Sequence, residues 1–525
     1  MVTGEANRQI ARAAGVVMAA FILSNITGLV RQVLVSEAFG TGAEMDAFNA
    51  AARLPDLLFS LVAGGALASA FIPTFTGFLT QNDKEGAWQL ASAIMNLVSL
   101  TLALVSALSA VFAPHIVRYV LSSLVSELDS AQFALTVSLL RVLLLSPVFF
   151  GISGLLMGIL NAHQVFLLPA LAPTMYWSGM IFGVLVLSPH MGIYGLAWGA
   201  VLGAGLHLGV QLPGLFRLTW EYIPTLGLQS PAVREVGRLM APRLLGVAVV
   251  QLNFVVNTIL AWAQPEGSLT AITIAWAVMT MPQVVIAQAI AIAALPTFSA
   301  QAAKGEMGEM RSSLAATLRG VILLSLPASI GLILLREPIV ALLFQRGAFD
   351  VHSTDLVAWA LLWYGAGLVS HSVVEIVSRA FYALHDTKTP VFVGVAAMSL
   401  NVGFSFLFAS LFSRLGWAPH GGLALANSLA TTLEMVGLLV LMRRRLGGLK
   451  GNYILQGVFK SAGATLVMGM AILLWLPRGG EQSVWIVGGG GVVIGLLAYG
   501  VGVLFLRLPE VYSLLGVARR LVKRG

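Results

Sequence analysis

Three arginines lie within long apolar segments of the chain, at Arg31, Arg53 and Arg141. A guanidinium group at the bilayer centre costs about 2.5–3.5 kcal/mol on insertion scales, so such a residue generally faces protein or a wet cavity. Its planar fork of donors matches the oxygens of a phosphate. We therefore expect the three arginines to line a cavity that receives an anion. The alternative is that they form internal salt bridges, for example Arg31 with Asp46, or snorkel toward the interface.

Arg31 and Arg53 are expected to lie at similar depths on consecutive helices, which the apolar pattern places at residues 9–38 and 45–80. At 1.5 Å per residue, Arg31 lies roughly 10 Å, and Arg53 roughly 13 Å, from the same end of the bundle. Arg141 lies deeper, on the fourth expected helix. The pair on the first two helices could therefore bind one anion between them.

Polar side chains in other apolar segments indicate a second kind of ligand. Glu434 lies about midway along its segment, and Asn257 and Asn401 lie in two others. A membrane carboxylate can bind a proton or another cation, so we predict these residues as weaker candidates for a coupling monovalent cation. The alternatives are that Glu434 pairs with an arginine or a hydroxyl group and that the asparagines join helices. No other cofactor and no metal site are expected, because the chain has no cysteine and its histidines lack metal-ligand spacing.

The composition predicts the kind of structure that positions these residues. The chain has 525 residues, of which 58% are hydrophobic and 10% charged, and its mean hydropathy is +0.90. Apolar runs of about 20 residues recur throughout, which predicts an all-α polytopic membrane protein with about 14 transmembrane helices. The alternating pattern of a membrane β-barrel is absent from the sequence. The expected helices are 9–38, 45–80, 86–117, 128–161, 166–188, 193–216, 231–263, 268–301, 311–335, 354–384, 389–412, 419–442, 455–477 and 483–507.

The net charge of +8 is an orientation signal rather than a nucleic-acid-binding surface, because the basic residues lie in loops between apolar runs. Alternate loops carry most of them, including the run Arg443, Arg444, Arg445 and the basic C-terminal tail. Basic loops stay in the cytoplasm, so both termini are predicted to be cytoplasmic.

Three pairs of segments suggest that the chain contains a repeat. Because the offset of 221–227 residues spans six expected helices, an even number, the two halves should have the same orientation. The pairs are "AFIPTF" (70–75) with "AALPTF" (293–298), "LNAHQVFLLPA" (160–170) with "YALHDTKTPV" (382–391), and "GLAWG" (195–199) with "GLALA" (422–426).

This repeat predicts two parallel six-helix lobes followed by two appended helices. Two pseudo-symmetric bundles of this kind are a common transporter plan. The predicted parts are an N-terminal lobe (1–216), a cytoplasmic linker (217–230), a C-terminal lobe (231–446), and the last two helices with the basic tail (447–525).

Several motifs make the chain resemble the MurJ (MviN) family of the multidrug/oligosaccharidyl-lipid/polysaccharide exporter superfamily. They are "GLVRQVLVSEAFGTGAEMDAFNAAARLPDLLFSLVAGGALASAFIPTF" (28–75), "ILNAHQVFLLPALAPT" (159–174), "VQLPGL" (210–215), "LFQRGAFD" (343–350) and "SRAFYALHDTKTPV" (378–391). The resemblance implies two six-helix lobes and two further helices that form a lipid-facing groove. It also implies a flippase of the bacterial cytoplasmic (inner) membrane that moves lipid II, the undecaprenyl-diphosphate-linked peptidoglycan precursor, from the inner to the outer leaflet. Such a protein breaks no bond and is a transporter rather than an enzyme.

The resemblance extends to individual site residues. Arg31, Asp46 and Arg53 fall on positions that are Arg, Asp and basic in the family, and Asn25 falls on a position that is Arg in well-studied flippases. With Arg141, these form the predicted substrate-binding set. The chain departs from the family pattern where other family charges are expected, at Phe59, Trp276, Ala277 and Thr280.

The expected partners are the lipid-linked glycan, membrane lipids and proteins of cell-wall synthesis, in keeping with a role in cell-wall biogenesis and cell shape. Two other functions stay open at this point. A cation-coupled multidrug exporter of the same superfamily would need carboxylates in its cavity. A non-transporting scaffold of a cell-envelope assembly complex would fit the missing charges.

Overall fold

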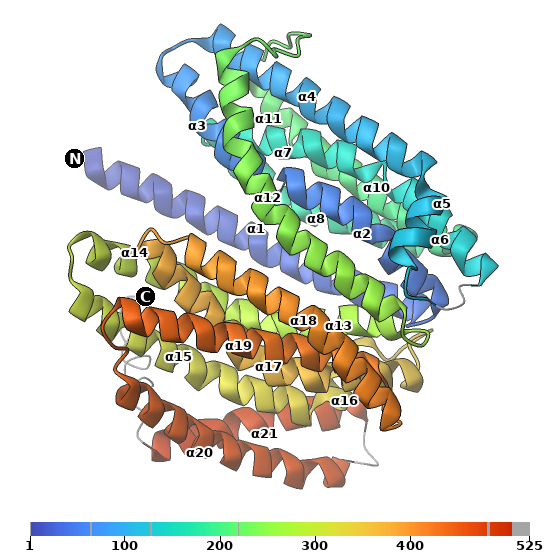
Figure 1. Cartoon of the computed structure of the whole chain (residues 1–525), viewed down its shortest axis with the longest axis vertical. Coiled ribbons are helices and arrows are strands. Elements are labelled where there is room, and N and C mark those ends of the chain that lie inside the picture. Colours follow the sequence, from blue (N-terminus) through green and yellow to red (C-terminus); the bar gives the residue numbers. More distant parts are fainter. Residues whose placement is uncertain (1, 64–65, 126–128, 219, 480–482, 507–525) are drawn as a thin grey trace. The chain divides into compact units, whose positions relative to one another are not determined.

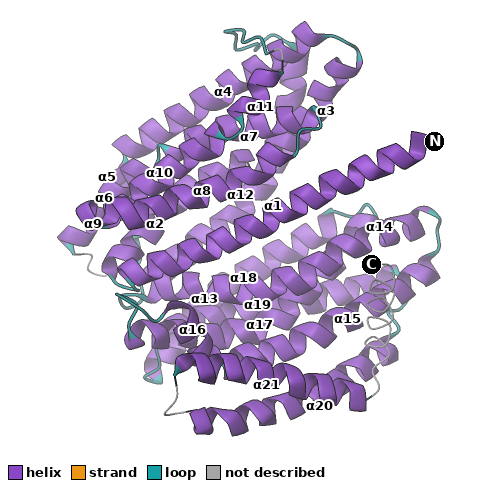
Figure 2. Ribbon diagram, turned by 180° about the vertical axis from the view of Figure 1, so that it is seen from behind, coloured by secondary structure: helices purple, strands orange, loops and turns teal. Residues whose placement is uncertain are grey.

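The computed structural model describes residues 2–63, 66–125, 129–218, 220–479 and 483–506. These residues form helices joined by short loops, with no strand among them (Figure 2). The all-α prediction is therefore confirmed. The predicted basic tail beyond residue 506 lies outside the described residues.

Twelve helical segments of the described residues are long and apolar enough to cross a membrane. The two other expected spans, 45–80 and 231–263, are also helical but have shorter apolar parts, Ala70–Thr80 and Val250–Trp262. Together they agree with the prediction of about 14. The expected helix at 45–80 is described as two helices, which end at Ala63 and begin at Ala66.

The chain divides into two compact units. Unit 1 contains Met1–Leu269 and the short segment Arg346–Phe349. Within it α1 packs on α8, α8 packs on α10, and α2 packs on α6, α7 and α12. Its main helices (Figure 1) are α1 (Val2–Phe39), α2 (Ala43–Ala63), α3 (Ala66–Thr80), α4 (Lys84–Val111), α6 (Ser130–Leu143), α7 (Ser146–Ala162), α8 (Leu167–Phe182), α10 (Ile193–Gly209) and α12 (Pro231–Trp262).

Unit 2 contains Thr270–Gln345 and Asp350–Gly525. The long helix α17 packs against α14, α15, α16 and α19, while α20 and α21 pair with each other and α20 packs on α15. Its helices (Figure 1) are α13 (Ser268–Gln283), α14 (Ala289–Ala303), α15 (Met307–Leu334), α16 (Arg336–Phe344), α17 (Val351–Ala383), α18 (Lys388–Arg414), α19 (His420–Arg445), α20 (Gly451–Trp475) and α21 (Val484–Phe505).

The sequence repeat and the helix packing assign α12 to different parts of the molecule. The repeat assigns it to the C-terminal lobe, which is predicted to begin at residue 231. In the structure it packs on α2 and α3 and falls in unit 1. The lobe boundaries and the superposition of the two halves stay predictions.

A seam of glycines lets α8 and α10 cross with their backbones in contact. A Cβ on Gly199 would lie 2.7 Å from the Cα of Gly183, and a Cβ on Gly183 would lie 2.6 Å from the carbonyl oxygen of Gly195. A Cβ on Gly203 would lie 3.0 Å from Cδ2 of Tyr176 and closer still to its carbonyl oxygen. Small residues at helix interfaces permit such close approach in membranes. The seam therefore sets the position of the part of α8 that carries Tyr176.

The loop between α17 and α18 provides a test of stability outside the apolar spans. The Thr389 N–H donates to Oδ1 of Asp386 at 3.0 Å and the Thr389 hydroxyl donates to Oδ2 at 2.8 Å. These bonds to the backbone N–H and the hydroxyl hold the pKa of Asp386 below its usual range. Losing such a cap costs about 1 kcal/mol, so Asp386→Ala should lower the melting temperature at pH 7.

The stabilisation by Asp386 requires the ionised carboxylate. Because its pKa is lowered in the folded state, the contribution is complete above the unfolded pKa of about 3.9 and is lost as the pH falls through the folded value. Wild type and Asp386→Ala should therefore converge when melting curves are recorded in acid. Asp129→Ala is the control, because the Asp129 side chain does not cap its helix. Equal effects of the two substitutions at pH 7 would contradict the prediction.

Candidate functional site

The first two predicted arginines and the side chains that hold them come from helices α1, α2, α8 and α12 of unit 1. Arg31 comes from α1 and Arg53 from α2, and both side chains are half-buried. The exposed carboxylate of Asp56, also on α2, interacts electrostatically with both of them. The structure of this unit is therefore compatible with the prediction that Arg31 and Arg53 bind one ligand.

Arg31 is held by an aromatic surface rather than by an acid. Its guanidinium carbon lies 4.8 Å from the centroid of the Trp177 ring on α8. Its Nε is buried and has no hydrogen-bond partner, and Arg31 makes no ion pair in the described part of the chain. A cation over an indole face gains about 0.5–2 kcal/mol, depending on how far it is desolvated. Trp177 therefore orients the Arg31 guanidinium without neutralising it.

Arg53 is fixed by α12. Its Nε donates to Oγ1 of Thr258 at 2.8 Å, and its guanidinium carbon lies 5.7 Å from the ring centroid of Phe254. The Thr258 hydroxyl in turn donates to the carbonyl oxygen of Phe254 at 2.9 Å. One neutral hydrogen bond and one aromatic face thus orient Arg53, and its positive charge is retained.

Asp46 has a structural environment. Its side chain is 3% exposed, and Oδ2 accepts a hydrogen bond from the N–H of Gly267 at 2.8 Å. Close by in sequence, the N–H of Ala43 donates to Oε1 of Glu266 at 2.9 Å. These two bonds attach the start of α2 to the loop after α12. Arg31 is not ion-paired with Asp46, so the predicted alternative of that salt bridge is not what the structure contains.

Arg141 and Asn25 make other contacts. Nε of Arg141, on α6, donates to the carbonyl oxygen of Ala110 at 3.1 Å, in the last turn of α4. Nδ2 of Asn25, on α1, donates to the carbonyl oxygen of Phe21 at 2.9 Å, within its own helix. Both side chains are exposed. Their predicted roles in substrate binding stay predictions.

The three weaker candidates come from three different helices. Glu434, on α19, is half-buried and makes no hydrogen bond or ion pair within the described residues. Asn401, on α18, is 3% exposed, and its Oδ1 accepts from the Ser405 hydroxyl at 3.5 Å. Asn257 belongs to unit 1, where its Nδ2 donates to the backbone and side-chain oxygens of Asn253 at 3.0 and 2.9 Å. The described residues contain no group of three or more acidic or histidine side chains arranged to hold a metal ion.

Sequence reasoning missed the partners that orient the two arginines. Trp177 and Thr258 lie far from the arginines in the chain and carry no local signal of that role. Asp56 did carry a signal, because it lies three residues after Arg53 on the same predicted helix and so on the same face. The Phe59 side chain, where the resemblance led us to expect a charge, packs on Phe150 with ring centroids 4.4 Å apart.

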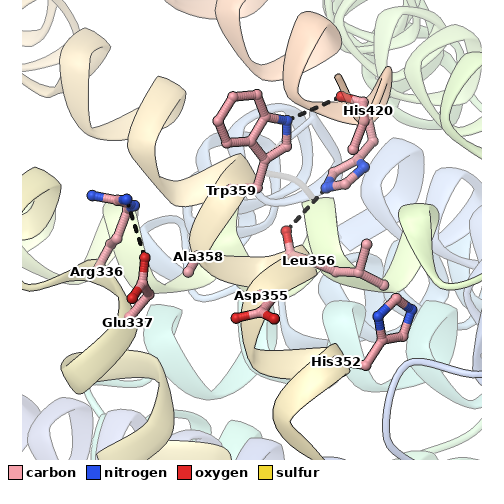
Figure 3. A pocket seen from close by; sticks show the side chains of 9 residues that line it. Arg336, Glu337, His352, Asp355, Leu356, Ala358, Trp359 and His420 are labelled. Atoms are coloured by element: carbon pink, nitrogen blue, oxygen red, sulfur yellow. Dashed lines mark hydrogen bonds and ion pairs between the residues drawn. The ribbon is translucent and has the colours of Figure 1, made fainter. Parts of the chain in front are cut away.

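The described residues of unit 2 form a smaller and a larger cavity, and the predicted arginines line neither. The smaller, of about 320 Å³, is at the first turns of α16, α17 and α19 (Figure 3). There His420 donates from Nε2 to the Leu356 carbonyl at 3.0 Å, and Arg336 pairs with Glu337 at 3.1 Å. The larger, of about 1020 Å³, lies between α15, α17, α19 and α20, and is apolar apart from basic and polar residues at one end, including Arg443 and Lys450.

A helical chain with a dozen membrane-length spans, one of which carries Arg31 without an acidic ion-pair partner, has the architecture of a polytopic membrane protein. The family model described as "Lipid II flippase MurJ" matches residues 35–488. The chain belongs to this family. It is 32% identical to the lipid II flippase MurJ of Burkholderia cenocepacia, over 81% of this chain and 82% of that one. It is 30% identical to the probable lipid II flippase MurJ of Vibrio cholerae, over 80% of each chain.

Solved structures share the fold. A lipid II flippase MurJ in an inward closed conformation matches with a TM-score of 0.79 and 24% identity, over 94% of this chain and 98% of that one. An inward-facing multidrug resistance transporter of the MATE family matches with a TM-score of 0.68 and 17% identity, over 83% and 99%. The predicted family is confirmed by the family model and the relatives, and the solved structures show that the fold is shared. Because flippases and drug transporters share this fold, the fold alone does not select the substrate.

Proposed function

We propose that the protein moves lipid II from the inner to the outer leaflet of the bacterial cytoplasmic membrane, with Arg31 and Arg53 binding the diphosphate. Membership of the family supports the substrate. The observation that carries the site is the environment of Arg31, which is oriented by Trp177 but has no acidic partner at ion-pair distance. An unpaired charge within a membrane span is energetically unfavourable, and such residues commonly mark the site where a substrate or ion binds. Transport breaks no bond, so we assign no catalytic residue.

The two arginines have complementary properties for this role. A diphosphate presents several anionic oxygens, and each guanidinium group can donate two parallel hydrogen bonds to such a group. Arg31 on α1 and Arg53 on α2 can therefore bind different oxygens of one diphosphate. Trp177 and Thr258 hold the guanidinium groups in place before the ligand arrives, which reduces the entropy lost on binding. We also retain Asn25, Asp46 and Arg141 as proposed members of the site, with the first two serving its geometry.

The polyprenyl tail would remain in the surrounding lipid or along α20 and α21. The outer faces of these helices carry large exposed apolar side chains, among them Phe459 at 73% and Phe505 at 85% exposed. Such surfaces suit contact with acyl or isoprenoid chains. The diphosphate and sugars would then cross through the protein while the tail moves in lipid. Proteins of cell-wall synthesis are the proposed partners that deliver and consume the substrate.

The orientation that this function needs has both termini in the cytoplasm, as the distribution of basic loops indicates. Because the chain has no cysteine, a single introduced cysteine reports the side of each loop. Lys450→Cys should resist a membrane-impermeant maleimide in intact cells and react after permeabilisation. Arg414→Cys, at the last residue of α18, should react in intact cells. The reverse pattern would overturn the orientation.

We propose that Glu434 couples transport to a proton or another monovalent cation, with Asn257 and Asn401 as further candidates. Glu434 is half-buried on a membrane-spanning helix and has no hydrogen-bond or ion-pair partner within the described residues, which is costly for an ionised carboxylate. Binding a cation removes that cost. Glu434→Gln should therefore weaken the dependence of transport on the ion gradient and leave basal flipping in place.

Cation-coupled drug export is the second candidate, because a MATE transporter shares the fold. The charges on α1 and α2 argue against it, since two arginines outnumber the one exposed carboxylate beside them. The deciding experiment combines complementation of a flippase-depleted strain with flipping of a fluorescent lipid II analogue in proteoliposomes. Growth together with flipping supports the proposal. Failure of both, with export of cationic drugs intact, would replace it by the second candidate.

A further inference from the structure

We propose that Asp56 is a built-in competitor of the substrate's diphosphate, which balances the charge of Arg31 and Arg53 when the site is empty and promotes release when it is full. The proposal rests on the proposed function, because that function makes the two arginines the diphosphate ligands. It adds a residue to the site and assigns it a role in turnover.

The position of Asp56 is the first argument. It lies one helical turn after Arg53 on α2, and it interacts electrostatically with Arg53 and with Arg31 on α1. Its side chain is exposed, whereas both arginines are half-buried. A single exposed carboxylate therefore lies on the same face of α2 as Arg53, and the positive charge of Arg31 on α1 also acts on it. Tyr176 also interacts electrostatically with this carboxylate and with Arg31.

The second argument is that Asp56 has no structural partner. It makes no hydrogen bond and no ion pair within the described residues, although Arg53 is only three positions away on the same helix. Asp46, on the same helix, is buried and bonded to the backbone N–H of Gly267. Two aspartates of α2 therefore have different environments: one fixes a loop, and the other acts only through its charge.

The physical role follows from the sum of charges. Two guanidinium groups brought together with no counter-charge repel each other and lose hydration. One carboxylate reduces the local charge from two to one, which stabilises the empty site. The same carboxylate repels an incoming diphosphate, so it lowers affinity. A transport site must bind its cargo and also let it go, and a competing charge fixed on the protein serves the second need.

The test uses Asp56→Asn, which removes the charge and keeps the size. Inorganic pyrophosphate is the probe, and its affinity for the full-length purified protein is measured by calorimetry. Removing one like charge a few ångströms from the ligand should tighten pyrophosphate binding by roughly tenfold, with the gain shrinking at high salt. In proteoliposomes the variant should flip a lipid II analogue more slowly at saturating substrate, because release is slowed.

Two matched variants make the result specific. Asp129→Asn makes the same chemical change at the start of α6, where the exposed side chain makes no capping bond, and it should leave pyrophosphate affinity unchanged. Asp56→Glu keeps the charge and should retain an affinity close to that of wild type. If Asp56→Asn does not fold, Asp56→Ser is measured in its place with the same expectation.

The outcomes separate this proposal from the function on which it rests. If Arg31→Ala abolishes pyrophosphate binding while Asp56→Asn leaves it unchanged or weakens it, the competitor role is wrong and the diphosphate site stands. If wild type, Arg31→Ala and Asp56→Asn all bind pyrophosphate equally, or none binds it, the diphosphate site fails and the competitor role fails with it. Tighter binding together with faster flipping would show that Asp56 does not act in release.

Discussion

Arg31→Ala is expected to reduce flipping of a lipid II analogue by more than roughly tenfold, while the protein still inserts and folds. The loss follows because a guanidinium group bound to a diphosphate makes charge-assisted, bidentate hydrogen bonds, which are about twice as strong as neutral ones. Folding should survive because Arg31 has no ion pair and its buried Nε has no partner, so its removal relieves a desolvation cost. Flipping rates in proteoliposomes and melting temperatures of the purified variants check both statements.

Two further variants separate binding from structure. Arg31→Lys keeps the charge but loses the planar fork and its stacking on Trp177, so it should retain part of the activity. Arg31→Ala/Asp46→Ala should be no better than Arg31→Ala, because Asp46 is bonded to Gly267 rather than to Arg31. A double variant that recovers both expression and flipping would restore the salt-bridge alternative. An active, well-folded Arg31→Ala protein would remove Arg31 from the proposed site.

Much of the fold could be predicted from the sequence because membrane spans obey a simple length rule. A run of about 20 apolar residues must be helical where no water is available to the backbone. The limits of that rule appear in the expected span at 45–80, because α2 carries Asp46, Arg53 and Asp56 and the short apolar part, Ala70–Thr80, lies in α3. The number of helices was easier to predict than their assignment to lobes. The packing of α12 on α2 and α3 depends on the side chains at the helix surfaces, and the spacing of a sequence repeat gives no information about these contacts.

The candidate site could be predicted only in its charged members. Arg31 and Arg53 are conspicuous because a buried charge is expensive. The groups that orient them are ordinary apolar or weakly polar residues, and Trp177 and Thr258 become noticeable only when α8 and α12 are placed in three dimensions. Arg141 was predicted on the same reasoning as the other two, yet its Nε is bonded to the end of α4. A charged residue within a span therefore indicates that the charge has a stabilising contact, but the sequence does not show whether that contact is a ligand, an ion pair or a hydrogen bond.

The second large effect is expected from a substitution where α8 crosses α10, because this crossing sets the position of Trp177, which contacts Arg31. Gly203 of α10 faces the backbone of Tyr176, the residue before Trp177. A methyl group there would overlap the Tyr176 carbonyl oxygen, and neither backbone can move without disturbing the adjacent contacts of Gly179 and Gly199. Overpacking of a well-packed interface costs about 1–3 kcal/mol, and backbone contacts leave little room for relaxation.

Gly203→Ala should therefore lower the melting temperature and the folded yield, and in the fraction that folds it should displace Trp177 from Arg31 and weaken pyrophosphate binding. Gly205→Ala is the matched control on the same helix, because no atom lies within 4 Å of a Cβ added there. Alanine favours a helix over glycine by about 0.5–1 kcal/mol, so the control should be neutral or slightly more stable. Melting curves and pyrophosphate calorimetry on both variants measure the difference. If the two alanine variants behave alike, the close contact of α8 with α10 does not position the arginine site, and the preorganisation of Arg31 must come from α1 alone.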